Sequence, residues 1–91
     1  MQHITNTLDL ATQKEYKDWT LLYFSASWCG PCKTMSPVMD RVSQHYEAQL
    51  SVMKIDVDQA QSLAAQYGIR SIPTLVLRHK EQAVETLVGA H

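Results

Sequence analysis

FSASWCGPCK, residues 24–33, contains the only two cysteines of a 91-residue chain, separated by a Gly-Pro dipeptide. The preceding segment, TLLYFSA over 20–26, is β-branched, aromatic and apolar at successive positions, which is typical of a strand buried on both faces. The following segment has apolar residues at helical spacing and predicts a helix from Pro31 to about Gln49. The cysteine pair therefore lies between a buried strand and the start of a helix.

The rest of the chain continues this alternation of strand and helix patterns. Further strands are predicted over 2–7, 50–57, 71–77 and 83–89, and further helices over 8–18 and 58–68. The last two strands predict an antiparallel hairpin without an Asn-Gly-type turn, so we expect a longer or less regular connection. The order βαβαβαββ predicts one α/β domain over residues 1–91, with a mixed, mainly parallel central sheet and helices on both faces.

Two of the predicted helices carry signals for their packing and their ends. In the helix after the cysteines, five apolar residues at helical spacing are expected to face the sheet: Met35, Val38, Met39, Val42 and Tyr46. The helix over 58–68 has Asp58 as its candidate N-cap and Gly68 as the residue that follows its C-cap.

The overall composition excludes several classes of function. The formal net charge is -1 and the pI is near 6.4, so no basic surface favours nucleic acid or an anionic membrane as a partner. The longest apolar run, Leu21 to Phe24, is too short to span a bilayer, and charged residues interrupt the N-terminal segment where a signal peptide needs an apolar core. We therefore expect a cytoplasmic protein.

The cysteine pair has three interpretations: a structural disulfide, half of a metal site, or a redox pair. A structural disulfide that closes so small a loop is disfavoured in a reducing cytosol. A closed zinc site needs four ligands, and the cysteines supply only two. None of the four histidines has a spacing that pairs it with the cysteines: His3, His45, His79 and His91. We expect no metal site, and a C-x-x-C at the start of a helix favours the redox pair.

The position of Cys29 predicts its chemical role. The first turn of a helix has unpaired N–H groups and the positive end of the macrodipole, and both favour a thiolate over a thiol. Cys29 lies at or just outside this turn, so we expect an accessible nucleophile. Cys32 follows one turn later on the same helix face, within reach of a disulfide, and Pro31 suits the first helical position.

Several spaced motifs resemble the thioredoxin family over nearly all of residues 3–91. They are WCGPCK, Pro37 in the following helix, KIDVD, YGIRSIPTLVL and a late VGA. The resemblance implies the thioredoxin fold and a protein-disulfide reductase, a thiol–disulfide oxidoreductase in which Cys29 attacks the substrate disulfide and Cys32 resolves the mixed disulfide. It also implies no bound cofactor, disulfide-containing proteins as substrates, and recharging by an NADPH-dependent thioredoxin reductase.

The resemblance also implies a surface on which substrates dock. Pro73 corresponds to the family's cis-proline opposite the cysteines, although only about 5–6% of X–Pro bonds in folded proteins are cis. The implied apolar docking surface comprises Trp28, Gly30, Pro31, Ile72, Pro73, Gly89 and Ala90. The alternative function is a thioredoxin-like module that binds proteins and has only incidental redox activity. An intact WCGPC argues against this alternative, because a binding module does not need both cysteines.

The chain departs from the family's pattern in its core and at its end. Tyr23 stands where most of the family has a buried aspartate, and Lys54 keeps the family's lysine without that partner. We expect Tyr23 to be mainly a core side chain whose hydroxyl holds a water, and Lys54 to be an ordinary strand lysine. The chain ends at His91, where the family continues into a C-terminal helix. An uncovered apolar sheet face then predicts weak self-association as a symmetric homodimer.

Overall fold

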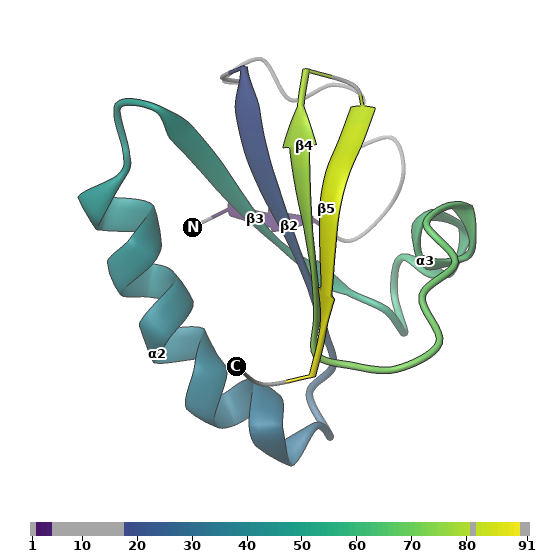
Figure 1. Ribbon diagram of the computed structural model, residues 1–91. Coiled ribbons are helices and arrows are strands. Elements are labelled where there is room, and N and C mark those ends of the chain that lie inside the picture. The colour runs from purple at the N-terminus through teal and green to yellow at the C-terminus, as the bar shows by residue number, and fades with distance from the viewer. Residues whose placement is uncertain (1, 5–17, 81, 90–91) are drawn as a thin grey trace.

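The computed structural model describes residues 2–4, 18–80 and 82–89 (Figure 1). Its elements in chain order are β1 (Gln2–Ile4), β2 (Trp19–Ser25), α2 (Gly30–His45), β3 (Leu50–Asp56), α3 (Gln61–Gln66), β4 (Thr74–His79) and β5 (Gln82–Val88). The five predicted strands are therefore present, as are the helices predicted after the first cysteine and before the terminal hairpin. The helix predicted over 8–18 lies outside the described residues except at its last position.

The strands form one mixed sheet in the order β1-β3-β2-β4-β5. Strands β1 and β2 run parallel to β3, whereas β4 is antiparallel to β2 and β5 is antiparallel to β4. Helix α2 lies against one face of the sheet and α3 against the other (Figure 1). The α/β class and the helices on both faces are thus confirmed. The two antiparallel strands on one side make the sheet mixed.

The centre of the sheet is β2, which contributes to a core on each face. Leu22 and Phe24 point to the α3 side, where they pack with Leu63, and Tyr23 points to the α2 side with Met35 and Met39. All three β2 side chains are fully buried. Because successive strand residues face opposite sides, a strand with helices on both faces is mostly apolar on both, as β2 is from Leu21 to Phe24, although Thr20 and Ser25 are buried polar residues.

Helix α2 differs from the prediction at both ends. It begins at Gly30, one residue earlier than expected, so that Pro31 is its second residue, and it ends at His45 instead of near Gln49. The chain leaves the helix at Tyr46, whose carbonyl accepts the N–H groups of Gln49 and Leu50 in the turn before β3.

The predicted sheet-facing stripe of α2 is only partly correct. Met35 and Met39 are buried and Val42 is half-buried, at the helical spacing i, i+4, i+7. Val38 and Tyr46 were expected on the same face, but they are 41% and 48% exposed. Val38 lies at the margin of the stripe, and Tyr46 is the residue at which the helix ends.

The ends of α3 give one wrong and one correct prediction. Asp58 is not the N-cap, because the helix begins at Gln61 and its N-cap is Ala60. Gly68 does follow the C-cap, with a φ of +65 that favours glycine. Its N–H donates to the carbonyl of Ala65, and the N–H of Ile69 donates to that of Ala64, which is the Schellman pattern.

The connection between β4 and β5 is shorter than expected. Strand β4 continues to His79 and β5 begins at Gln82, so only positions 80 and 81 separate them. Lys80 adopts a φ of 57, the left-handed conformation that two-residue hairpin turns use. The longer connection is therefore not needed, because Lys80 adopts the conformation that glycine or asparagine usually supplies. The predicted irregularity is present as a register shift between Leu77 and Arg78.

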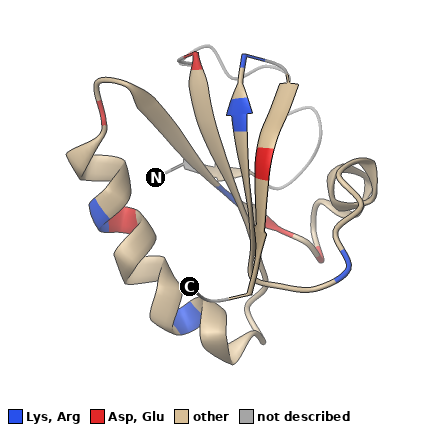
Figure 2. Ribbon diagram, in the orientation of Figure 1, with Lys and Arg blue, Asp and Glu red and all other residues tan. Residues whose placement is uncertain are grey.

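Figure 2 marks acidic and basic residues of both signs on α2 and along the sheet, whereas α3 carries none. This distribution agrees with the small net charge of -1. Within the described part of the chain, no helix has the length and apolar character needed to cross a membrane.

Candidate active site

The two cysteines lie at the N-terminus of α2, directly after the carboxyl end of β2. Cys29 is the N-cap residue, in an extended conformation, and a disulfide joins it to Cys32 across a Cα–Cα distance of 5.3 Å. The backbone N–H of Cys32 donates a hydrogen bond to the Sγ of Cys29 at 3.2 Å. The predicted junction of strand, cysteine pair and helix is therefore present, and an otherwise unpaired helix N–H is directed at the Cys29 sulfur.

Cys29 is less accessible than expected. Its exposed fraction is 4% and that of Cys32 is 2%, because the disulfide belongs to the core on the α2 side of the sheet. Tyr23, Ala26 and Leu75 are buried in the same cluster. A sequence motif indicates that Cys29 is at the start of a helix, but burial depends on the strands that pack around it.

The Ile72–Pro73 peptide bond is cis, as the family resemblance implied. Ile72 packs against the core cluster that contains both cysteines, and Pro73 is buried. The carbonyl of Pro73 accepts the N–H of Gly89 at 2.8 Å, and Gly89 has a φ of +88. Three of the expected docking residues thus lie together at the start of β4 and the end of β5. Ala90 lies outside the described residues.

A groove of about 400 Å³ lies next to Trp28, the residue that precedes Cys29. It is lined by Trp28, Val57, Ala64, Ile69, Arg70, Ser71 and Ile72. Of the expected docking residues, Trp28 and Ile72 line this groove, whereas Gly30 and Pro31 are exposed at the start of α2. Sequence reasoning missed Arg70, although it lies two residues before Ile72 in the YGIRSIPTLVL motif.

The indole of Trp28 is held at the mouth of this groove. The side chain is 67% exposed, and its Nε1–H donates to Oδ2 of Asp58 at 2.7 Å. Asp58 is itself oriented because its backbone N–H donates to Oδ1 of Asp56 at 2.8 Å. The carboxylate that was predicted to cap α3 therefore positions the aromatic residue next to Cys29.

Tyr23 makes direct contact with the helix that carries the cysteines. Its hydroxyl donates to the backbone carbonyl of Cys32 at 2.9 Å and lies 3.2 Å from Oγ of Ser36. The predicted water on this hydroxyl stays a prediction, and the two groups of α2 are direct protein partners that sequence reasoning did not foresee. Ser36 was not singled out from the sequence, although a residue four positions after Cys32 lies on the same helix face.

Lys54 is connected to the same group of residues. Its Nζ donates to Oγ of Ser36 at 3.1 Å and lies 6.0 Å from the centroid of the Tyr23 ring. Tyr23 and Lys54 are direct neighbours in the pairing of β2 with β3. Lys54 is therefore a strand lysine, as expected, whose ammonium group has a hydrogen-bond partner on α2.

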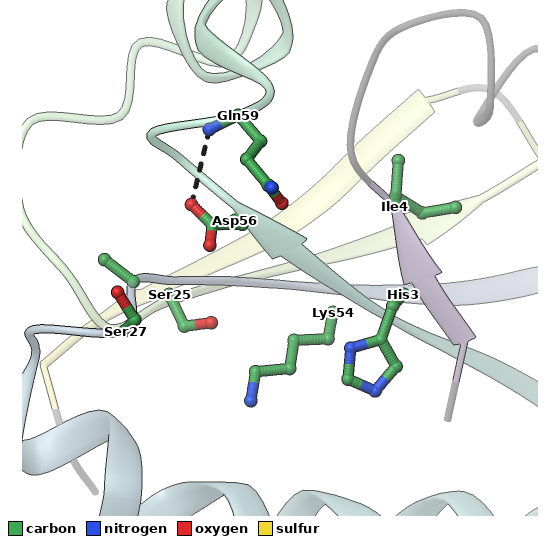
Figure 3. Close-up of a pocket in the computed structure, with 8 residues that line it drawn as sticks. His3, Ile4, Ser25, Ser27, Lys54, Asp56 and Gln59 are labelled. Atoms are coloured by element: carbon green, nitrogen blue, oxygen red, sulfur yellow. Dashed lines mark hydrogen bonds between the residues drawn. The ribbon is translucent and has the colours of Figure 1, made fainter.

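The stem of Lys54 lines a second pocket, of about 180 Å³. The other lining residues are His3, Ile4, Ser25, Ala26, Ser27, Asp56 and Gln59. Figure 3 shows the Lys54 side chain beside His3, with its nitrogen extending away from the strand. Oδ1 of Asp56 accepts the N–H of Gln59, so this carboxylate is engaged in the turn after β3 (Figure 3).

These features agree with comparisons to known proteins. The Thioredoxin family profile matches residues 3–91. The chain belongs to the thioredoxin family. A curated relative, thioredoxin 1 of Synechococcus elongatus, is 50% identical over 70 residues, which cover 77% of this chain and 65% of the relative. The match therefore spans less than two thirds of that thioredoxin.

Solved structures confirm the thioredoxin fold. The germline-specific thioredoxin Deadhead of Drosophila has a TM-score of 0.93 and 31% identity, covering 100% of this chain and 89% of that one. A structure concerning the thiol-resolving mechanism of a yeast mitochondrial 1-Cys peroxiredoxin through glutathione and thioredoxin systems has a TM-score of 0.87 and 28% identity. It covers 100% of this chain and 85% of that one.

Proposed function

We propose that this thioredoxin-family chain is a thiol–disulfide oxidoreductase that reduces disulfide bonds in proteins. The observation that supports this most directly is the Cys29–Cys32 disulfide at the N-terminus of α2, with the N–H of Cys32 donating to the Cys29 sulfur. In the reduced protein the same donor and the positive end of the helix stabilise a thiolate at Cys29. A binding module gains nothing from this arrangement.

The reaction proceeds by two exchanges at sulfur. The Cys29 thiolate attacks one sulfur of the substrate disulfide, a Cys29–substrate disulfide forms, and the other substrate sulfur leaves as a thiolate. Cys32 then loses its proton to solvent and attacks the Cys29 sulfur. This second exchange forms the Cys29–Cys32 disulfide and releases the second substrate thiolate. Two electrons pass from the cysteine pair to the substrate, and no cofactor takes part.

The groove next to Trp28 is the surface that brings the substrate to Cys29. Such a surface is needed because Cys29 is only 4% exposed. Trp28 on the groove lining and Ile72 against the cysteine cluster provide apolar contacts. The family resemblance adds Gly30, Pro31, Pro73, Gly89 and Ala90 to the proposed docking surface. The exposed guanidinium of Arg70 on the groove lining favours substrates with an acidic residue near the disulfide. An extended segment of a disulfide-containing protein matches this shape and charge.

Several partners and properties follow from family membership as further proposals. An NADPH-dependent thioredoxin reductase would reduce the Cys29–Cys32 disulfide again, and peroxiredoxins are one class of substrate, which the structure on the yeast 1-Cys peroxiredoxin favours. A cytoplasmic location and weak self-association stay predictions. Sedimentation velocity at several protein concentrations tests the self-association.

The function is tested by insulin reduction in the presence of dithiothreitol, followed by turbidity. The wild-type chain should accelerate precipitation of the insulin chains, and Cys29→Ser should abolish the acceleration. Cys32→Ser should still attack and should accumulate a mixed disulfide that mass spectrometry detects. A folded wild-type chain that leaves insulin intact would favour the binding module, and an active Cys29→Ser variant would show that the nucleophile is assigned wrongly.

A further inference from the structure

Three hydrogen bonds connect Lys54 on β3 to the backbone of Cys32 on α2. A carbonyl only accepts, so the single proton of the Tyr23 hydroxyl is committed to the Cys32 carbonyl at 2.9 Å. The 3.2 Å contact between Tyr23 and Ser36 must then use the proton of the serine. The Lys54 ammonium only donates, and it completes the series by donating to Oγ of Ser36 at 3.1 Å.

All three donors therefore point in one direction, from the ammonium group to the Cys32 carbonyl. Hydrogen bonds in such a series polarise one another, and the charged donor strengthens the whole. Tyr23 is fully buried, so water does not compete for its hydroxyl. Ser36 is the only side chain of the series that comes from the helix of the cysteines, and without its hydroxyl the Lys54 ammonium has no hydrogen-bonded link to the Tyr23 hydroxyl.

The series matters most when the disulfide is open. In the oxidised chain the sulfur–sulfur bond itself keeps Cys32 next to Cys29, across a Cα–Cα distance of 5.3 Å. In the mixed disulfide with a substrate this bond is absent, and non-covalent contacts alone orient the Cys32 thiol. Intramolecular attack is sensitive to such orientation, since a misplaced reacting group loses much of its effective concentration.

We propose that Ser36 is a positioning residue for the resolving step. Its hydroxyl joins Lys54 to Tyr23 and so holds the Cys32 backbone in place for attack on the Cys29–substrate disulfide. This inference rests on the proposed oxidoreductase function. It assigns a specific role in the second exchange and none in the first, because the Cys29 sulfur receives its hydrogen bond from the Cys32 N–H and not from this series.

Rapid mixing of the reduced protein with one equivalent of dithio-bis-nitrobenzoate separates the two exchanges. The first nitrothiobenzoate is released when Cys29 attacks the reagent, and the second is released when Cys32 attacks the mixed disulfide. The first rate depends on reagent concentration and the second does not. Ser36→Ala should slow the second release about three- to tenfold, the factor that one hydrogen bond is commonly worth, and leave the first release within about twofold.

A matched pair of variants distinguishes the hydroxyl from the shape of the side chain. Ser36→Thr keeps the hydroxyl and Ser36→Val has nearly the same shape without it, so the second release should be faster in Thr than in Val. Ser43→Ala, seven residues further along α2, is the control for removing a serine hydroxyl from this helix and should leave both rates unchanged. Thermal unfolding of each oxidised variant reports separately on stability.

Combined variants test the connection. If Ser36 acts through Tyr23, then Ser36→Ala should add little to the effect of Tyr23→Phe on the second release, because either change interrupts the same series. Equal second-release rates for Ser36→Thr and Ser36→Val, an unchanged rate for Ser36→Ala, or fully additive effects with Tyr23→Phe would overturn the inference. A wild-type chain that releases no second nitrothiobenzoate would instead refute the proposed function itself.

Discussion

Replacing Tyr23 with the aspartate that most of the family has at this position should strongly destabilise this chain. Tyr23 is fully buried in the α2-side core, and its hydroxyl donates to Cys32 and contacts Ser36. Tyr23→Asp removes the aromatic ring, at a cost comparable to the 3–5 kcal/mol of a large aromatic-to-alanine change, and it places a carboxylate in the space left. The Lys54 ammonium, 6.0 Å from the centroid of the Tyr23 ring, offsets part of the cost of burying this carboxylate.

The matched control is Tyr23→Phe, which keeps the ring and removes only the hydroxyl. Its cost should be about 1–2 kcal/mol, for the hydrogen bond to the Cys32 carbonyl and for the Ser36 hydroxyl that loses its acceptor. Urea unfolding of the three oxidised proteins at neutral pH, with the slopes checked for equality, measures both values. We expect Tyr23→Asp to lose at least about 3–5 kcal/mol in its free energy of unfolding, which is more than twice the loss in Tyr23→Phe.

This reasoning would be refuted if the stability losses of Tyr23→Asp and Tyr23→Phe differed by less than about 0.5 kcal/mol. Ordinary surface substitutions change stability by that much. So small a difference would show that the site accommodates a carboxylate and that the ring contributes little. If Tyr23→Phe were as stable as the wild type, the two hydrogen bonds of the Tyr23 hydroxyl would not contribute to stability.

Two further predictions concern substrate docking and the end of α3. Arg70→Glu should lower kcat/KM more for peptide disulfides flanked by acidic residues than for peptide disulfides flanked by neutral ones, because a carboxylate would replace the guanidinium on the groove lining. Equal losses of kcat/KM for both peptides would show that Arg70 does not select substrates. Gly68→Ala should cost about 1 kcal/mol in thermal unfolding, because alanine is strained at a φ of +65 although no atom lies within 4 Å of its added carbon. Gly30→Ala is the control, since it also has open space and lacks a positive φ, and its stability should be unchanged or higher.

The positions of the main elements follow from local patterns. A strand covered by helices on both faces is mostly apolar on both, and this is why β2 was recognisable as a strand buried on both faces. The helix after the cysteines was recognisable from its period, and Gly68 from its need for a left-handed conformation. The cis bond before Pro73 came from the family resemblance alone, because no local pattern predicts it.

The sequence by itself therefore determined the α/β order, the doubly buried strand before the cysteines and the place of the cysteine pair at the start of α2. Only the tertiary structure decided that Cys29 is buried, that Asp58 holds Trp28 instead of capping α3, and that Ser36 connects Lys54 to Tyr23. The physical reason is the range of the interactions. Hydrophobic periodicity and helix-end signals act between near neighbours, whereas these contacts join residues 13 to 30 positions apart, whose meeting depends on strand register and on how α2 packs over the sheet.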